Sequence, residues 1–420
     1  SGELPASRHC QQVFPSVPSL EERIVHQTGD NARPLFMPRS IGAGTGPRWQ
    51  NYVLEKGEGL VSLWRSRGEA DSSVLLVLGK GFDPRTCLGA QTLLERAGIP
   101  KCDAIAIELD EGASSPSKAH SELVKANWAA LERLIDGKGV LSTRKLKMWS
   151  EDGRRIGSRS AAGLFGSLED FAAYTDVVID ISALPRAVFF PLIAKVLYLL
   201  DHGSVAPGRK KPNLHVLVAE DTILDCRIRD EGIDEAASYV HPFGGRLEME
   251  ATADHPRVWM PVLGEGQGTQ LNRIYDLVMP DEIAPILPSP SVNPRRSDDL
   301  LLEYRELLFD RLRVEPSNFI FASEQNPFEV YRQIRRVIVH YREALEPLGG
   351  CKAVLSALST KLLSVGVLLV VYELKEAKID VGIAHVECQG YTLRAEDGSG
   401  NGDAGSELFD LWLWGECYES

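Results

Sequence analysis

Two short turns in the chain combine hydroxyl groups with a positive charge. Residues 182–186 read Ser-Ala-Leu-Pro-Arg, and residues 356–361 read Ser-Ala-Leu-Ser-Thr-Lys. Each turn follows a short aliphatic run and precedes a long apolar stretch that is typical of a buried helix. Hydroxyls, a nearby cation and the free N–H groups of a helix N-terminus together favour binding of an anion. We therefore expect Arg186 and Lys361 to hold phosphate groups.

Four further polar residues belong to these turns and have two possible roles. Asp180 ends the first aliphatic run, where an aspartate is costly unless it is paired or lies near the strand end. Asp180 could bond Arg186 or cap a neighbouring loop, and Ser359 could cap the helix that follows it. Ligand contact and structural capping therefore both stay open for Asp180, Ser182, Ser356 and Ser359.

A third loop, Gly-Lys-Gly-Phe-Asp-Pro-Arg-Thr at residues 79–86, follows an aliphatic run. Its glycines would let backbone N–H groups approach a phosphate, and its two cations would neutralise the charge. The loop contains neither the G-x-x-x-x-G-K-[ST] nor the G-x-G-x-x-G phosphate-binding motif. A tight turn with surface charges is the alternative. The candidate ligand-binding residues of this loop are Gly79, Lys80, Gly81, Asp83, Arg85 and Thr86.

A fourth loop, Ser-Glu-Gln-Asn-Pro-Phe at residues 323–328, occupies the corresponding position in the second half of the chain. Both loops follow an apolar run and contain an Asp-Pro or Asn-Pro pair. The order strand, Asx-Pro loop, helix, strand, Ser-Ala-Leu turn and helix thus occurs twice, which indicates a duplicated unit. Chance recurrence is the alternative, because Asx-Pro turns are common. Glu324 and Asn326 are candidates for reading sugar hydroxyls or a base edge.

The composition excludes several classes of protein. With 420 residues two domains are expected, and the net charge of −13 argues against a protein that coats DNA or RNA. The seven cysteines are scattered, so we expect reduced thiols, no metal site and no cofactor. The apolar runs 187–200 and 362–372 are too short to span a bilayer, and the chain opens without a signal peptide. A cytoplasmic protein without a membrane segment is therefore expected.

Strands that alternate with helices predict an α/β fold of two Rossmann-like, mostly parallel sheet halves in pseudo-tandem. In such sheets ligands bind at the carboxyl ends of the strands. We expect residues 381–391 and 407–418 to close the second sheet as an antiparallel C-terminal hairpin. The expected divisions are an N-terminal arm or small subdomain over 1–70, a first Rossmann-like domain over 71–223, a connector with a Pro-rich linker over 224–315, and a second, shorter Rossmann-like domain over 316–420.

The paired pattern resembles the CARF and SAVED families of prokaryotic immunity, which are Rossmann-like domains that sense cyclic or linear oligonucleotides. The turns 180–186 and 356–361 resemble the Ser/Thr-rich turn of a CARF domain, which precedes an apolar helix, and the loops 79–86 and 323–328 resemble its first loop. The usual Gly-Gly-Thr-Lys element is missing, and Pro185 replaces one of its residues. The resemblance implies a sensor in antiviral defence whose effector is supplied by a partner protein.

Three functions follow from these patterns. The first is a binding module for a nucleotide or oligonucleotide signal, with phosphates held by Lys80, Arg85, Arg186 and Lys361. The second is an enzyme that acts on a nucleotide or nucleotide-sugar, with Asp83, Asp180 or Glu324 as acid or base. The third is a structural subunit of a larger complex.

Overall fold

The computed structural model describes residues 46–68, 72–249, 253–394 and 405–418. Most of the N-terminal arm expected over 1–70 lies outside these residues. Its described part forms strand β1 (Val53–Lys56) and helix α2 (Gly57–Arg67).

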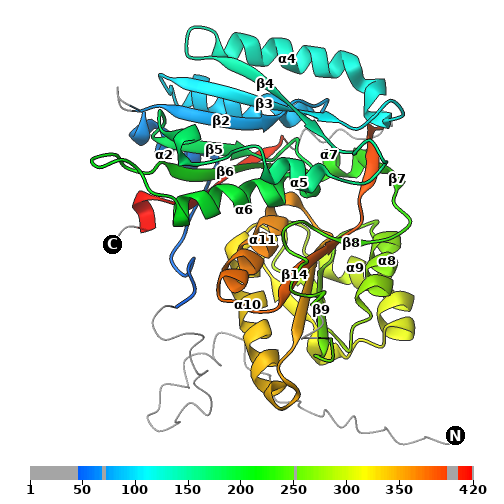
Figure 1. The fold of residues 1–420 in the computed structure, drawn as a ribbon. Coiled ribbons are helices and arrows are strands. Elements are labelled where there is room, and N and C mark those ends of the chain that lie inside the picture. The colour runs from blue at the N-terminus through cyan, green and yellow to red at the C-terminus, as the bar shows by residue number, and fades with distance from the viewer. Residues whose placement is uncertain (1–45, 69–71, 250–252, 395–404, 419–420) are drawn as a thin grey trace, which may run out of the picture. The chain divides into compact units, whose positions relative to one another are not determined.

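The first sheet contains five parallel strands in its centre and two antiparallel strands at one edge (Figure 1). The central strands are continuous aliphatic runs that are buried on both faces, as expected for a parallel sheet. In spatial order the parallel strands are β4 (Leu141–Lys147), β3 (Cys102–Asp110), β2 (Val74–Gly79), β5 (Asp176–Asp180) and β6 (Asn213–Glu220). Strand β16 (Glu407–Trp414) pairs antiparallel with β6, and β1 pairs antiparallel with β16.

The second sheet has the same plan. Its spatial order is β12 (Ile320–Ala322), β11 (Ile286–Pro288), β9 (Arg257–Val262), β13 (Lys352–Ala357), β14 (Val381–His385) and β8 (Ser238–Tyr239). These strands are parallel except for β8, which is antiparallel to β14. The short β10 (Glu282–Ile283) also pairs with β9.

Both halves therefore share one topology. In each, the first parallel strand lies in the middle, the next two lie on one side, and the fourth and fifth lie on the other. This is the strand order of the Rossmann fold, and an antiparallel strand completes both sheets. The predicted fold class of two Rossmann-like halves is confirmed.

Three details of the sequence prediction differ from the structure. The strand that corresponds to β2 is β9 and not β12, so the loop 323–328 follows an edge strand and is not the counterpart of the loop 79–86. The C-terminal strand β16 pairs with β6 and β1 instead of forming a hairpin with residues 381–391. A two-stranded ribbon of β7 (Ile228–Ile233) and β15 (Cys388–Leu393) takes up part of that segment. The range 224–315, expected to be a connector, supplies β9 and β11 to the second sheet.

Helices connect or follow the parallel strands in both halves. In the first half they are α3 (Leu88–Gln91), α4 (Ser121–Ile135), α5 (Gly157–Ala162), α6 (Arg186–His202) and α7 (Thr222–Arg227). In the second half they are α8 (Gly268–Val278), α9 (Arg296–Glu303), α10 (Pro327–Ala344) and α11 (Lys361–Glu376).

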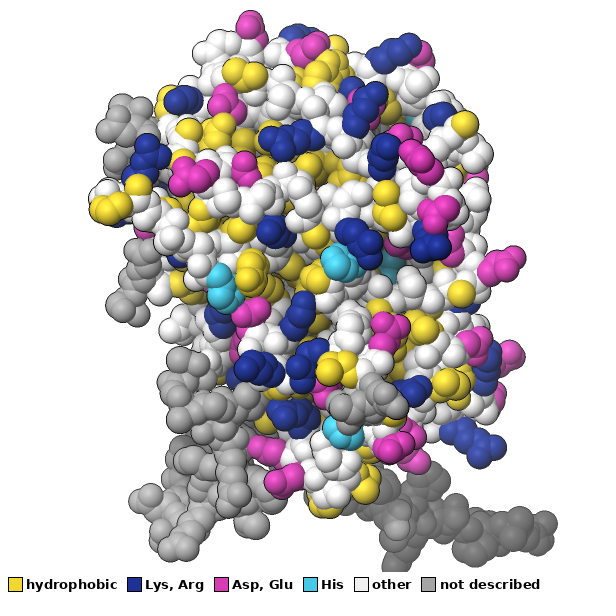
Figure 2. Space-filling model, viewed as in Figure 1, with side chains coloured by type: hydrophobic (Ala, Val, Ile, Leu, Met, Phe, Trp, Pro, Cys, Tyr) yellow, Lys and Arg dark blue, Asp and Glu magenta, His cyan; other side chains and the backbone are white. Residues whose placement is uncertain are grey.

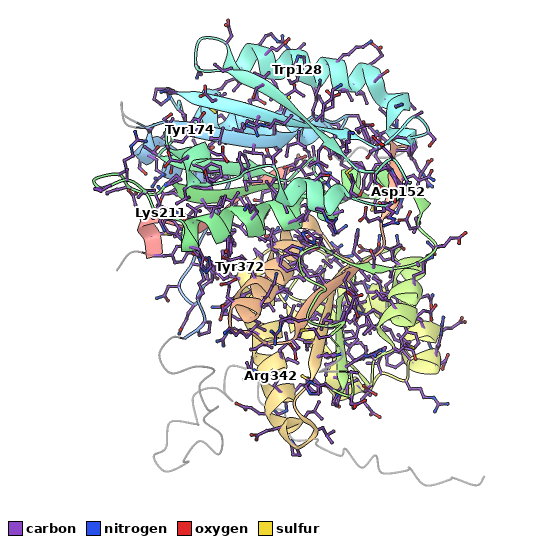
Figure 3. All side chains as sticks on the ribbon, in the orientation of Figure 1. Trp128, Asp152, Tyr174, Lys211, Arg342 and Tyr372 are labelled. Carbon is purple, nitrogen blue, oxygen red and sulfur yellow. The ribbon has the colours of Figure 1, made fainter. Side chains whose placement is uncertain are left out.

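Helices α6 and α11 are the two long apolar runs of the sequence, and they contact each other. Twelve of the 17 residues of α6 and twelve of the 16 residues of α11 are buried, which explains why their apolar character extends around most of the helix. At their distal ends, the Tyr372 hydroxyl of α11 donates to the Asp201 carboxylate of α6 over 2.6 Å (Figure 3 labels Tyr372). No helix in the described ranges is long and apolar enough to cross a bilayer.

Candidate functional site

A cavity of about 1010 Å³ lies where the carboxyl ends of the central strands of both halves meet. The loops that follow β2, β5, β9 and β13 all contribute to its wall, at residues 79–83, 183–186, 264–267 and 358–361. In each half the chain leaves neighbouring strands in opposite directions at this point, which is where open α/β sheets bind their ligands.

The two Ser-Ala-Leu turns lie side by side in the wall of this cavity and are joined by reciprocal hydrogen bonds. The Arg186 guanidinium donates to the carbonyl of Ser359 and, over 3.1 Å, to the hydroxyl of Ser364. In return, Lys361 Nζ donates to the carbonyl of Ser182. Arg186 and Lys361 are each the first residue of a long apolar helix, so the cations occupy equivalent places in the two halves. The structure thus brings both predicted cations into one wall.

Lys361 has an unusual protonation equilibrium. Burial, together with the positive charge of Arg85, lowers the pKa of the Lys361 ammonium to about 8, although Asp83 and Asp225 act in the opposite direction. A substantial fraction of the Lys361 side chains therefore carries a neutral amine slightly above physiological pH.

Glu220 occupies the position at which an anion was expected on helix α11. Its carboxylate accepts a hydrogen bond of 2.8 Å from the backbone N–H of Leu362 in the first turn of α11. Burial and the nearby Asp225 raise the pKa of Glu220 to about 7. Because this carboxylate already caps the helix, a phosphate in the cavity would meet the side chains of Lys361 and Arg186 first.

Asp83 and Arg85 form a buried ion pair in the cavity wall. Arg85 donates to Asp83 over 2.9 Å and to Asp225 over 2.7 Å. Burial opposes both charges, but the pairing outweighs it, so the pKa of Arg85 is raised and that of Asp83 is lowered. Thr86 bonds the carbonyl of Asp83 and lies behind the wall. The ion pair between Asp83 and Arg85 thus holds this loop in place, and the N–H donors of Arg85 bond protein acceptors.

The hydroxyls of Ser182 and Ser356 and the Asp180 carboxylate lie behind the cavity and hold the turns in place. Ser182 Oγ accepts from the N–H of Ala219 over 2.9 Å, and Ser356 Oγ accepts from the indole of Trp259 over 3.0 Å. Asp180 accepts from the N–H of Ser182, and burial raises its pKa to about 6. The two serines are not structural equivalents, because Ser356 lies within β13 whereas Ser182 follows the end of β5.

Glu324 and Asn326 lie away from the cavity lining. Glu324 accepts from the N–H of Val292 over 2.9 Å and pairs with Arg296. Asn326 caps α10 and donates to the hydroxyl of Tyr52 over 2.7 Å. Glu324 thus lies behind the wall, against the lining residue Arg296, and the strand β12 that precedes it is at the edge of its sheet.

The loop that sequence reasoning missed is residues 264–267, after β9. Its signal is the pentapeptide Val-Leu-Gly-Glu-Gly at 262–266, which matches Val-Leu-Gly-Lys-Gly at 77–81. The first glycine of each pentapeptide is needed for packing against the turns. A Cβ on Gly79 would lie 2.8 Å from the carbonyl oxygen of Ala183, and one on Gly264 would lie 2.3 Å from that of Leu358. The equivalent loops therefore pack directly on the equivalent turns.

Two residues hold the loop 264–267 rigidly. The Tyr304 hydroxyl donates to the carbonyl of Gly264 over 2.5 Å and accepts from the N–H of Gln267 over 2.8 Å. The Glu303 carboxylate accepts from the N–H of Gly266 over 2.8 Å. This wall is therefore formed before any ligand binds.

The first half contributes an aromatic side chain to the cavity. Trp128 projects from α4 (Figure 3), and the Lys80 ammonium lies 4.6 Å from the centre of its ring. Lys80 also pairs with Glu108 over 2.7 Å. Aromatic rings next to cations are surfaces on which nucleobases stack. Among the described residues no group of three or more His, Cys, Asp or Glu side chains could hold a metal ion.

Comparisons with known proteins show similarity at the level of solved structures alone. No family model matches the chain, and no curated protein matches it. One similar structure is a Type III CRISPR defence DNA nuclease activated by cyclic oligoadenylate, with a TM-score of 0.38, 10% identity and coverage of 71% of this chain. The match spans 64% of the nuclease, less than two thirds of its length.

Two further structures are less similar. The first is a functionally unknown protein from Pseudomonas aeruginosa PAO1, with a TM-score of 0.20 and 11% identity; the match covers 76% of this chain and 94% of that protein. The second is a universal stress protein from Archaeoglobus fulgidus DSM 4304, with a TM-score of 0.21 and 9% identity; the match covers 76% of this chain and 97% of that protein. At such TM-scores and identities we draw no functional argument from any of the three.

Proposed function

We propose that the protein binds a nucleotide or oligonucleotide signal in the cavity shared by the two Rossmann-like halves. The observation that carries this proposal is the reciprocal placement of Arg186 and Lys361. Each cation begins a long helix at the end of a central strand, and each reaches across to the opposite turn. A phosphate placed between the turns would contact both cations.

The cations have donors left for a ligand. A guanidinium and an ammonium each carry more N–H donors than Arg186 and Lys361 use in their contacts with the turns. The cavity is lined by nine basic and seven acidic side chains, a positive balance in a chain of net charge −13. This local excess favours an anionic ligand.

The dimensions of the cavity support a ligand larger than a simple ion. Its volume of about 1010 Å³ lies at the upper end of the range of roughly 300–1,000 Å³ that ligand pockets occupy. Figure 2 shows basic and acidic side chains interspersed on the visible face. That face is unlike the basic stripe by which proteins coat nucleic acids.

The enzyme hypothesis has weaker support from the same residues. Asp83 is committed to an ion pair, Asp180 lies behind the turn, and Glu324 is away from the cavity lining. The CARF- or SAVED-type role of a defence sensor, with a partner protein as effector, is the finer form of our proposal and rests on the resemblance of the turns.

Thermal-shift measurements with mono-, di- and cyclic nucleotides test the proposal. A ligand that binds the native protein raises its melting temperature. We expect such a shift with the wild type and with Lys210→Ala, whose side chain is 85% exposed. The double variant Arg186→Ala with Lys361→Ala should lose the shift while keeping the circular dichroism of the folded protein. An unchanged shift in that variant places the site elsewhere, and no shift with any nucleotide at millimolar concentration contradicts the proposal.

A further inference from the structure

Three buried polar atoms without a hydrogen-bond partner belong to the second-half side of the cavity. They are Ser359 Oγ, Gln270 Oε1 and Arg296 Nε, and no partner for them exists among the described residues. Their residues are 8%, 4% and 9% exposed, and all three line the cavity. Buried polar groups in native proteins are nearly always paired, because an unpaired group loses its hydration without compensation. Three such groups in one wall indicate a surface built for a polar ligand.

These groups surround the rigid loop 264–267. A Cβ on Gly264 would lie 2.8 Å from Ser359 Cα, so the loop touches this serine directly. Arg296 pairs with Glu265 of the loop over 2.7 Å. Gln270 lies in the first turn of α8, immediately after the loop. The groups are thus neighbours on preorganised elements, and the residues that carry them line the same cavity.

The orientation of the Gln270 amide is fixed by Asp230. Gln270 Nε2 donates to the Asp230 carboxylate over 3.3 Å. A carboxylate only accepts hydrogen bonds, so the NH2 group must face Asp230 and the carbonyl oxygen Oε1 is left for the cavity. Gln270 therefore presents an acceptor and not a donor.

The two halves differ in charge at this point. Lys80 of the first-half loop has the position that Glu265 has in the matching pentapeptide of the second. The second-half wall offers acceptors from Gln270 and Glu265, a donor from Arg296 and a hydroxyl from Ser359 that can serve as either. The unpaired Gln270 Oε1 and the Glu265 carboxylate suit a neutral group that carries N–H donors.

We propose that this wall reads the amino-bearing edge of a nucleobase. The exocyclic amine donates to Gln270 Oε1, and the adjacent ring nitrogen accepts from Arg296. This proposal rests on the function proposed above and adds a specificity: the protein prefers adenine and cytosine to their oxo counterparts, hypoxanthine and uracil. Phosphates are bound by Arg186 and Lys361, and the base lies on the second-half side.

Isothermal titration calorimetry with matched probes tests this preference. The probes are AMP against IMP, CMP against UMP, and cyclic di-AMP against its inosine analogue. We expect about tenfold tighter binding of the amino member of each pair, the value of one well-placed hydrogen bond. Gln270→Leu should bring the ratio close to one. Arg186→Ala should weaken both members equally and leave the ratio unchanged.

A second variant keeps the test decisive if Gln270→Leu does not fold. Asp230→Asn, at an exposed position, frees the Gln270 amide to turn its NH2 group toward the cavity and should shift the preference toward the oxo member. Equal or tighter binding of the oxo probes by the wild type overturns the base-edge proposal while the proposed function stands. No binding of any probe overturns both.

Discussion

The ammonium of Lys361 links ligand binding to pH. Its pKa of about 8, lowered by burial and by Arg85, means that it loses its proton as pH rises from 7 to 9. Because the charged form binds phosphate, we expect nucleotide affinity to fall by about tenfold over this interval. Calorimetric titrations at pH 7, 8 and 9 measure the fall. Lys361→Arg, which stays charged, should flatten the profile, and an equally steep profile in that variant would remove Lys361 from the site.

Glu220 lowers the stability of the native state at neutral and alkaline pH. Its pKa is raised from an ordinary 4.5 to about 7, so the folded state binds the proton more tightly than the unfolded state does. The stabilisation by this proton is complete below pH 4.5 and is lost as pH rises through 7.

Glu220→Gln tests this effect, because glutamine still accepts from the N–H of Leu362 but carries no charge. We expect it to raise the free energy of unfolding above pH 7 by on the order of 2 kcal/mol and to change it little at pH 4. Urea denaturation at pH 4 and 8 measures both values. The same effect at both pH values would show that charge is not the cause.

The loop 264–267 can pack on the turn 356–361 only because Gly264 has no side chain. Alanine at position 264 would place its Cβ 2.3 Å from the carbonyl oxygen of Leu358, a backbone atom of the turn that follows β13. We expect Gly264→Ala to lower the free energy of unfolding by about 2–3 kcal/mol. Gly268→Ala is the matched control, since its Cβ would meet nothing closer than 3.8 Å. Comparable losses for both variants in thermal melts would contradict this packing.

The first half of the molecule is completed by residues from the far end of the chain. Strand β16 lies between β6 and β1, and its buried Asp410 accepts from Trp64 over 2.6 Å and contacts His215 over 3.0 Å. A fragment of residues 46–223 would leave the edge of β6 unpaired and the His215 and Trp64 side chains without this acceptor.

We therefore expect the fragment 46–223 to lack a cooperative melting transition, and the same fragment joined to residues 405–420 by a flexible linker to regain it. Differential scanning calorimetry of both fragments measures the difference. A cooperative transition of the shorter fragment would mean that β16 is dispensable for this sheet.

Local patterns were sufficient to predict the two turns, their cations and the helices behind them. Strands and helices leave periodic signatures in the sequence, and turns at the ends of buried parallel strands meet at the carboxyl edge of the sheet. Arg186, Ser359, Lys361 and the loop 79–83 were found in this way and do line one cavity.

Only the tertiary structure decided which strands are neighbours and which charged side chains stay available to a ligand. Both 257–262 and 320–322 are apolar runs, and their central or edge position depends on packing between residues far apart in the chain. Arg85 is paired with Asp225, and Lys361 bonds the carbonyl of Ser182, contacts that span 140 and 179 positions. The sequence determines the residue types at a site, whereas distant partners determine how many of their hydrogen bonds remain for a ligand.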